Sequence, residues 1–136
     1  MTAAEDAQVG TRLLCLIDPR DSIKYTEAKG VDVVAVHGLD AAGGCTSWTT
    51  PDGTLWLRDL LPSDIPCARV LAFLYDSEAL FTRFSVESVA RSLLSALAMS
   101  RQDVPSTRPL VLVGHGFGGF VIEAVRAITF IRSYTS

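Results

Sequence analysis

Four short apolar runs along the chain predict β-strands. They lie at residues 13–17, 31–36, 69–75 and 110–114, and most of their residues are Val, Leu, Ile or Ala. The apolar residues follow one another almost without interruption, which is typical of parallel strands covered on both faces. The pattern therefore predicts a largely parallel sheet whose strands are buried on both sides.

Two segments with helical spacing accompany these strands. In residues 84–102 the apolar positions recur every three or four residues, and Ser85 is placed to cap the helix. A second apolar stripe begins at Val121, with Glu123 and Arg126 on the opposite side. The order strand, helix, strand predicts a right-handed parallel crossover and hence an α/β fold class.

Composition and charge exclude several classes of function. The chain has 136 residues, 49% of them hydrophobic, which is enough for one core of ordinary size. Its net charge is −3 and its 12 Lys and Arg residues are scattered, so no basic surface for nucleic acid is predicted. No apolar run approaches the roughly 20 residues that cross a bilayer. The first residues lack the features of a signal peptide, so we expect an intracellular, cytoplasmic protein with a disordered tail at residues 1–10.

The cysteines and histidines indicate neither a disulfide framework nor a metal site. Cys15, Cys45 and Cys67 are odd in number and far apart, and the chain has two histidines, His37 and His115. No cluster of His, Cys and carboxylate residues has the spacing of a metal site. We therefore expect three free thiols, no metal and no cofactor.

A glycine-rich turn follows the last predicted strand. Residues 114–119 read Gly-His-Gly-Phe-Gly-Gly and connect an apolar strand to a helix. In the nucleophile elbow G-x-S-x-G, a serine stands between two glycines, and here Gly116 occupies that position between Gly114 and Gly118. The dinucleotide-binding pattern G-x-G-x-x-G is matched by Gly114, Gly116 and Gly119. The turn thus fits either an elbow without its serine or an intact cofactor loop.

The surrounding sequence favours the elbow. A dinucleotide loop needs an acidic residue about 20 positions further on to hold the ribose. After Glu123 the chain contains no Asp or Glu. The cofactor loop also normally follows the first strand of its unit, whereas this turn follows the last predicted strand. A nucleotide-binding module therefore stays the second alternative.

A second glycine-rich loop follows the strand at residues 31–36. It begins with His37, Gly38 and Leu39, and a loop in this place can supply one N–H group of an oxyanion hole. We interpret His37 as a residue that shapes the loop and His115 as an ordinary part of the turn, since a triad histidine comes from a distant loop. Cys45 has no base placed to activate it as a nucleophile.

Four motifs carry a resemblance to a known family. They are Asp-Val-Val-Ala-Val-His-Gly-Leu at 32–39, Trp-Leu-Arg-Asp-Leu-Leu-Pro at 56–62, the segment 68–76, and the turn at 114–119. In this order and spacing they resemble the α/β-hydrolase superfamily. The closer resemblance is to the serine esterases of the SERAC-like group, which also occur as amino-terminal domains of fungal NLR-type receptors. The resemblance implies that residues 11–136 form the amino-terminal half of an α/β-hydrolase-like domain.

The resemblance also implies roles for individual residues. The family cleaves acyl esters with a triad of Ser, His and Asp or Glu, and Gly116 stands at the serine position. The N–H groups of Phe117 and Leu39 would hold the oxyanion, while Trp56 and Asp59 would have structural roles. Gly116 has no side chain to form an acyl-enzyme. The acid and histidine of the family fall beyond the segment that resembles it.

Three functions follow as expectations. The first is a hydrolase-like module without esterase activity, a pseudoenzyme or interaction domain. The alternatives are a fragment or inactivated form of a serine esterase or lipase, and a nucleotide-binding module. An acyl ester or lipid is the candidate ligand.

The expected fold gives one further expectation about partners. The sheet order should be 69–75, 31–36, 110–114, with 13–17 beyond the first of these strands and helices on both faces. The outer edge of the strand at 110–114 would then lie open to a protein partner or to a missing downstream half.

Overall fold

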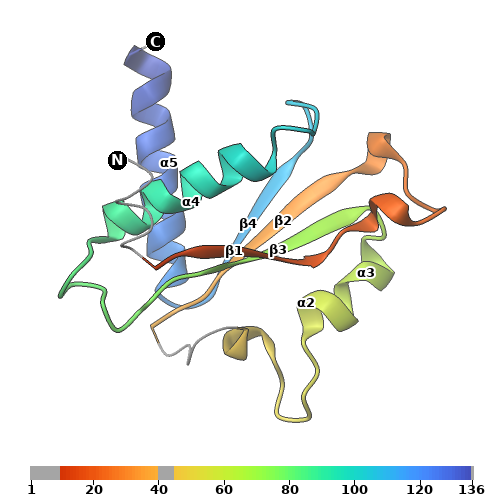
Figure 1. Cartoon of the computed structure of the whole chain (residues 1–136), viewed down its shortest axis with the longest axis horizontal. Coiled ribbons are helices and arrows are strands. Elements are labelled where there is room, and N and C mark those ends of the chain that lie inside the picture. Colours follow the sequence, from red (N-terminus) through yellow and green to blue (C-terminus); the bar gives the residue numbers. More distant parts are fainter. Residues whose placement is uncertain (1–9, 40–44, 136) are drawn as a thin grey trace.

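The computed structural model describes residues 10–39 and 45–135 and contains one mixed sheet of four strands (Figure 1). The strands are β1 (Arg12–Ile17), β2 (Val31–Val36), β3 (Ala68–Leu74) and β4 (Leu110–Gly114). Their order in the sheet is β1-β3-β2-β4, which confirms the predicted order. The tail expected at residues 1–10 lies outside the described residues, apart from Gly10.

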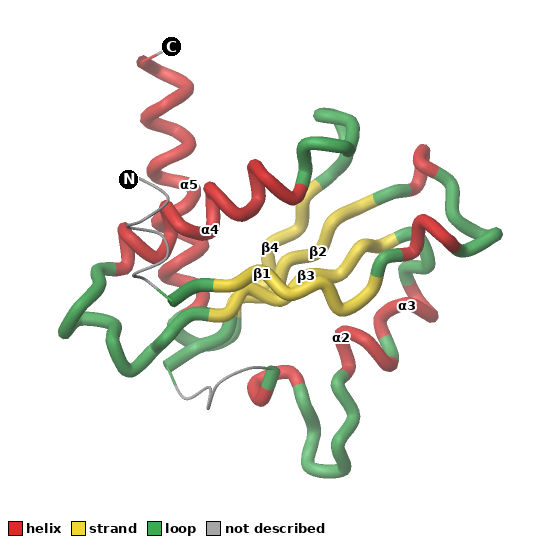
Figure 2. The backbone as a smooth tube through the Cα atoms, viewed as in Figure 1, coloured by secondary structure: helices red, strands yellow, loops and turns green. Residues whose placement is uncertain are grey.

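The register of the sheet brings the carboxyl ends of three strands together. β2 pairs in parallel with β3, Val34 opposite Leu71, and in parallel with β4, Val34 opposite Leu112. β1 is antiparallel to β3. The mostly parallel pairing places the loops after β2, β3 and β4 at one end of the sheet, as Figure 2 shows. In open α/β sheets this is the end at which ligands bind.

Helices cover both faces of the sheet. On one face lie α4 (Val86–Ser100) and α5 (Gly118–Thr135), which pack against each other, and on the other lie the short α2 (Trp56–Asp59) and α3 (Leu61–Asp64). Three single 3-10 turns complete the described elements: η1 (Pro19–Asp21), η2 (Glu27–Lys29) and η3 (Thr46–Trp48). Among the described helices, none is long and apolar enough to span a bilayer.

The core has two halves separated by the sheet. One half joins Val34 and Phe73 to the buried stripes of α4 and α5, including Leu93 and Val121. The other half joins Val33, Ala35 and Val70 to the irregular segment that contains Trp48, Leu55 and Leu57. Because strand side chains alternate between faces, each nearly continuous apolar run supplies both halves.

One local expectation needs correction. The strand at 110–114 was expected to be buried on both faces. In the structure β4 is the edge strand that the expected order made it, but its faces are only partly covered, and Leu110 and Val111 are 39% and 45% exposed.

The predicted cap of the long helix is confirmed. The Ser85 side chain accepts a hydrogen bond from the Ser88 N–H, and the Ser88 side chain accepts one from the Ser85 N–H. This reciprocal pair is a capping box, which satisfies two backbone donors at the start of α4. The hydrogen bonds therefore fix where the helix begins.

A buried ionic cluster lies at the amino end of β2, far along the strand from the loops. Asp32 is fully buried and accepts hydrogen bonds from Arg69 Nε at 2.9 Å, from Arg69 Nη2 at 2.8 Å and from Arg101 Nη1 at 2.5 Å. Arg108 Nη1 lies 3.3 Å from the same carboxylate and also pairs with Glu27. The cluster ties β2 and β3 to the end of α4 and to the loop before β4.

Candidate functional site

The turn after β4 has Gly116 at its apex. Its φ angle is +55°, in the left-handed region that glycine adopts without strain. The nearest atom to a Cβ placed on Gly116 is Gly38 Cα, at 4.0 Å. A side chain at this position would therefore stand in open space, facing the loop after β2.

The glycines on either side of the apex are required by close backbone packing. A Cβ on Gly114 would lie 2.7 Å from Gly119 N, and one on Gly118 would lie 2.1 Å from Val36 O. Both distances are far below any van der Waals contact. Gly118 therefore lets the turn press against the end of β2, and Gly114 lets the turn fold tightly onto the start of α5.

The same geometry separates the elbow from the cofactor loop. In the dinucleotide pattern the third glycine allows the helix to pack closely on the strand, and here that residue would be Gly119. A Cβ on Gly119 meets nothing within 4 Å. The space is restricted at Gly118 instead, which is the second flanking glycine of the frame G-x-S-x-G.

His37 holds the loop after β2 against the end of β3. The ring is buried, stacks on Tyr75 with centroids 4.2 Å apart, and accepts a hydrogen bond at Nε2 from the Tyr75 N–H at 3.2 Å. Nε2 is therefore unprotonated, and Nδ1 carries the hydrogen that it donates to Gly38 O at 2.7 Å. The Tyr75 hydroxyl donates to His37 O at 2.8 Å. Both ring nitrogens are engaged by backbone groups, so His37 shapes the loop and is not placed as a base.

The loop N–H groups assigned to the oxyanion lie on the two facing turns. Phe117 follows the apex, and Leu39 follows Gly38, whose Cα faces that apex. Neither N–H donates to any other group in the part of the chain that the structure describes. The Leu39 carbonyl accepts a hydrogen bond from Ser77 Oγ at 3.0 Å, a link that fixes this loop to the turn after β3. The rest of the glycine-rich loop, residues 40–44, lies outside the described residues.

His115 anchors the turn and makes one aromatic contact. Its N–H donates to Val36 O at 3.0 Å, and its exposed ring meets Trp48 edge-on, with centroids 5.9 Å apart. No carboxylate among the described residues bonds to its ring. Trp48 is buried, and its Nε1–H has no hydrogen-bond partner in the described chain. His115 therefore lacks the orienting acid that a triad histidine needs.

Trp56 and Asp59 lie on the supporting segment behind the turn. Trp56 packs edge-on against Trp48, with centroids 6.0 Å apart. The Asp59 carboxylate accepts a hydrogen bond from the Leu55 N–H at 2.9 Å and pairs with Arg58 at 2.9 Å. Burial raises the pKa of the Cys45 thiol on the same segment, which makes it a poor nucleophile at neutral pH. These residues shape the site and supply no reactive group.

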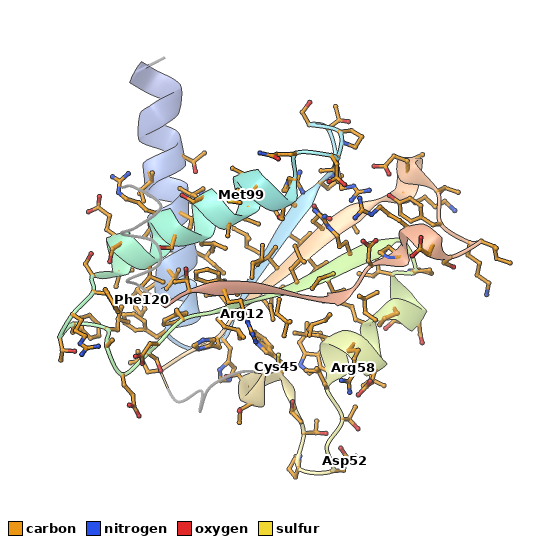
Figure 3. All side chains as sticks on the ribbon, in the orientation of Figure 1. Arg12, Cys45, Asp52, Arg58, Met99 and Phe120 are labelled. Carbon is orange, nitrogen blue, oxygen red and sulfur yellow. The ribbon has the colours of Figure 1, made fainter. Side chains whose placement is uncertain are left out.

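A group of phenylalanines beside the apex was not predicted from the sequence. Phe81 and Phe117 meet edge-on with centroids 5.4 Å apart, and Phe117 and Phe120 lie 5.1 Å apart. Phe81 and Phe120 are 68% and 63% exposed, and Figure 3 labels Phe120 at this end of the molecule. Phe81 also has a φ angle of +73°, which is uncommon for a bulky residue. Such strained residues cluster at ligand-binding sites.

The described residues offer no metal site and no disulfide. No group of three or more His, Cys, Asp or Glu side chains in the described chain could hold a metal ion. Cys15, Cys45 and Cys67 are free thiols. This end of the sheet carries a glycine apex, the N–H groups of Leu39 and Phe117, which have no acceptor among the described residues, and an exposed aromatic surface.

Comparison with known proteins identified no relative of this chain. No family model matches the chain, and neither a curated protein nor a solved structure matches it. A function for the chain therefore depends on its own residues.

Proposed function

We propose that this chain is an α/β-hydrolase-like module that binds an apolar acyl group or lipid without cleaving it. The observation that carries the proposal is the turn at Gly116, with its positive φ angle, open Cβ position and two flanking glycines that tolerate no side chain. This is the shape a nucleophile elbow needs to present a serine above the sheet. Glycine at the apex keeps the shape and removes the nucleophile.

The order of the strands also supports a hydrolase-like module. An antiparallel strand lies outside three parallel strands, and the two glycine-rich loops extend from the adjacent strands β2 and β4. Both loops therefore face the same space above the sheet. The N–H groups of Leu39 and Phe117 are available there to a carbonyl or carboxylate oxygen.

The ligand class follows from the surface next to the apex. Phe81, Phe117 and Phe120 provide an exposed apolar surface, and backbone N–H groups provide hydrogen-bond donors. An apolar surface with a few convergent donors suits a ligand that has an acyl chain and one polar end. A small, highly polar ligand without an apolar chain would bury little apolar surface against the aromatic rings.

Ester hydrolysis tests the absence of activity. We expect no turnover of p-nitrophenyl butyrate by the chain, and none by Gly116→Ser, because a serine without a base remains a weak nucleophile. Gly53→Ser is the matched control, since Gly53 also has a positive φ angle and open space but lies in a turn distant from the site. Turnover by the unmodified chain would overturn the proposal. Turnover by Gly116→Ser alone would instead favour an inactivated serine esterase whose base is still present.

Ligand binding tests the apolar surface. Decanoate should bind the chain, and the binding should be visible calorimetrically and as a change in tryptophan fluorescence, since Trp48 contacts His115 at the turn. Phe81→Ala and Phe120→Ala should each weaken binding by about tenfold, the effect of losing roughly 1.4 kcal/mol of contact. Met99→Ala removes an exposed apolar side chain from α4 and should have no effect. Equal affinity of all four proteins would contradict the proposed site.

A further inference from the structure

The outer edge of β4 lacks the features that protect an edge strand from association. β4 is Leu-Val-Leu-Val-Gly, with no charged residue and no proline within it. Monomeric proteins usually protect such edges with lysine, proline, a bulge or a covering segment. Within the described chain β4 pairs only with β2. An apolar, unprotected edge of this kind is a template on which another strand can pair.

Two hydrogen bonds determine which backbone groups point outward. The Asp32 N–H donates to Pro109 O at 3.0 Å, and the His115 N–H donates to Val36 O at 3.0 Å. In a parallel ladder, alternate residues of a strand bond to the same neighbour. Pro109, His115 and the odd-numbered residues between them therefore bond to β2.

The even-numbered residues of β4 face the open edge. They are Leu110, Leu112 and Gly114, and their N–H and C=O groups all point away from β2. These groups are spaced symmetrically about Leu112. A strand with this pattern is complementary to its own antiparallel copy.

We propose that β4 is the interface through which two copies of this chain form a dimer with twofold symmetry. Leu112 of one copy faces Leu112 of the other, and Leu110 faces Gly114. Each facing pair exchanges two hydrogen bonds, because these are the positions at which an antiparallel ladder is hydrogen-bonded. The two sheets then join into one, and the symmetry closes the assembly at two copies. This inference does not depend on the proposed ligand.

Charges beside the edge suit a second copy. A groove of about 990 Å³ is lined by β4, α4 and α5, and its charged lining residues are Arg91, Arg101, Glu123 and Arg126. Each of these arginines pairs with a carboxylate of the same chain: Arg91 with Glu87, Arg101 with Asp32 and Arg126 with Glu123. Because each positive charge is offset in this way, an identical groove can approach across a twofold axis without strong net repulsion. The charges therefore permit the self-pairing that the backbone pattern predicts.

The oligomeric state of the full chain tests the proposal. Light scattering in concentrated solution should give twice the 14.6 kDa mass of one chain. Val111→Lys places a charge at the edge and should yield a monomer with an unchanged circular dichroism spectrum. Met99→Lys makes the same kind of change at an exposed position on α4 and should remain dimeric (Figure 3). A monomeric unmodified chain in concentrated solution, or a dimeric Val111→Lys variant, would overturn the proposal.

Amide hydrogen exchange tests the register residue by residue. Dilution should speed exchange at Leu112 and Gly114, whose N–H groups are bonded only in the dimer. Val111 and Val113 should exchange slowly in both states, because their N–H groups bond to β2. Fast exchange at Leu112 in concentrated solution would overturn the pairing, as would open-ended oligomers in place of a closed dimer.

Discussion

Replacing Asp32 with asparagine should strongly destabilise the fold. The carboxylate is fully buried and faces three arginines, Arg69, Arg101 and Arg108. Asparagine keeps the size of the side chain but removes the negative charge that all three arginines share. Positive charge then stays at a site where water cannot solvate it.

The magnitude follows from the burial of the cluster. Breaking a buried ion pair by removing one partner costs about 3 to 5 kcal/mol. For a chain of this size each kcal/mol lowers Tm by roughly 3 to 5 °C, so Asp32→Asn should melt about 9 to 25 °C below the unmodified chain. Glu27→Gln is the matched control. It alters a partner of the same Arg108, but Glu27 is 46% exposed, so its loss should be much smaller.

Denaturant and thermal unfolding, monitored by circular dichroism, measure both variants. If Asp32→Asn unfolds within about 1 kcal/mol of the unmodified chain, the cluster contributes no more than an exposed ion pair and the reasoning fails. Equal losses for Asp32→Asn and Glu27→Gln would refute it as well. In that case the depth of burial would not decide the contribution of a charge in this protein.

Three further predictions concern acid stability, the turn and the loop. Burial raises the pKa of Asp32, but the three arginines lower it by more than burial raises it, so the pKa lies below its ordinary value of 3.8. The stability that the Asp32 carboxylate contributes is therefore complete above the ordinary pKa and is lost as the pH falls through the lowered one. Asp32→Asn should accordingly flatten the acid limb of a pH-stability curve. Gly118→Ala should lower the free energy of unfolding, measured in urea, by at least about 1 to 3 kcal/mol, because the added Cβ would overlap the β2 backbone. Gly119→Ala should leave the stability unchanged or raise it by up to about 1 kcal/mol, because its Cβ meets no other atom within 4 Å. Tyr75→Phe leaves the buried His37 carbonyl without its donor and should cost about 1 kcal/mol, and a change near zero would show that water replaces the hydroxyl.

If Gly118→Ala and Gly119→Ala behaved alike, the turn would not press on β2 as described. That result would also weaken the proposed function, because the tight packing at Gly118 is what distinguishes the elbow from a dinucleotide loop. The pair of variants therefore tests the proposed function by stability alone, independently of any ligand.

Local sequence signals predicted most of the fold. The apolar runs located the ends of all four strands to within one residue, because a strand buried in a sheet must be apolar along its length. Helical spacing located α4, and Ser85 marked its start. The start of α5 was predicted three residues late, since Gly118 and Gly119 resemble a loop when read without their neighbours.

The candidate site was only partly predictable. The sequence placed the glycine-rich turn and the loop at His37 at the ends of strands, because each directly follows an apolar run. The expected strand order then made those two strands neighbours. It gave no sign of the surface formed by Phe81, Phe117 and Phe120. Phe81 comes from the loop after β3 and meets the other two only when the sheet aligns the loops. No periodicity in the sequence records such a contact.

The sequence by itself determined the elements, the glycine frame of the turn and the absence of a serine at Gly116, because these depend on residues close together in the chain. The tertiary structure decided what each flanking glycine packs against, which tautomer His37 adopts, and that Phe81 joins Phe117 and Phe120 beside the apex. Most of these depend on groups that approach from distant parts of the sequence. Asp32 illustrates the difference: in the sequence it interrupts an apolar strand, and only folding brings the three arginines that surround it.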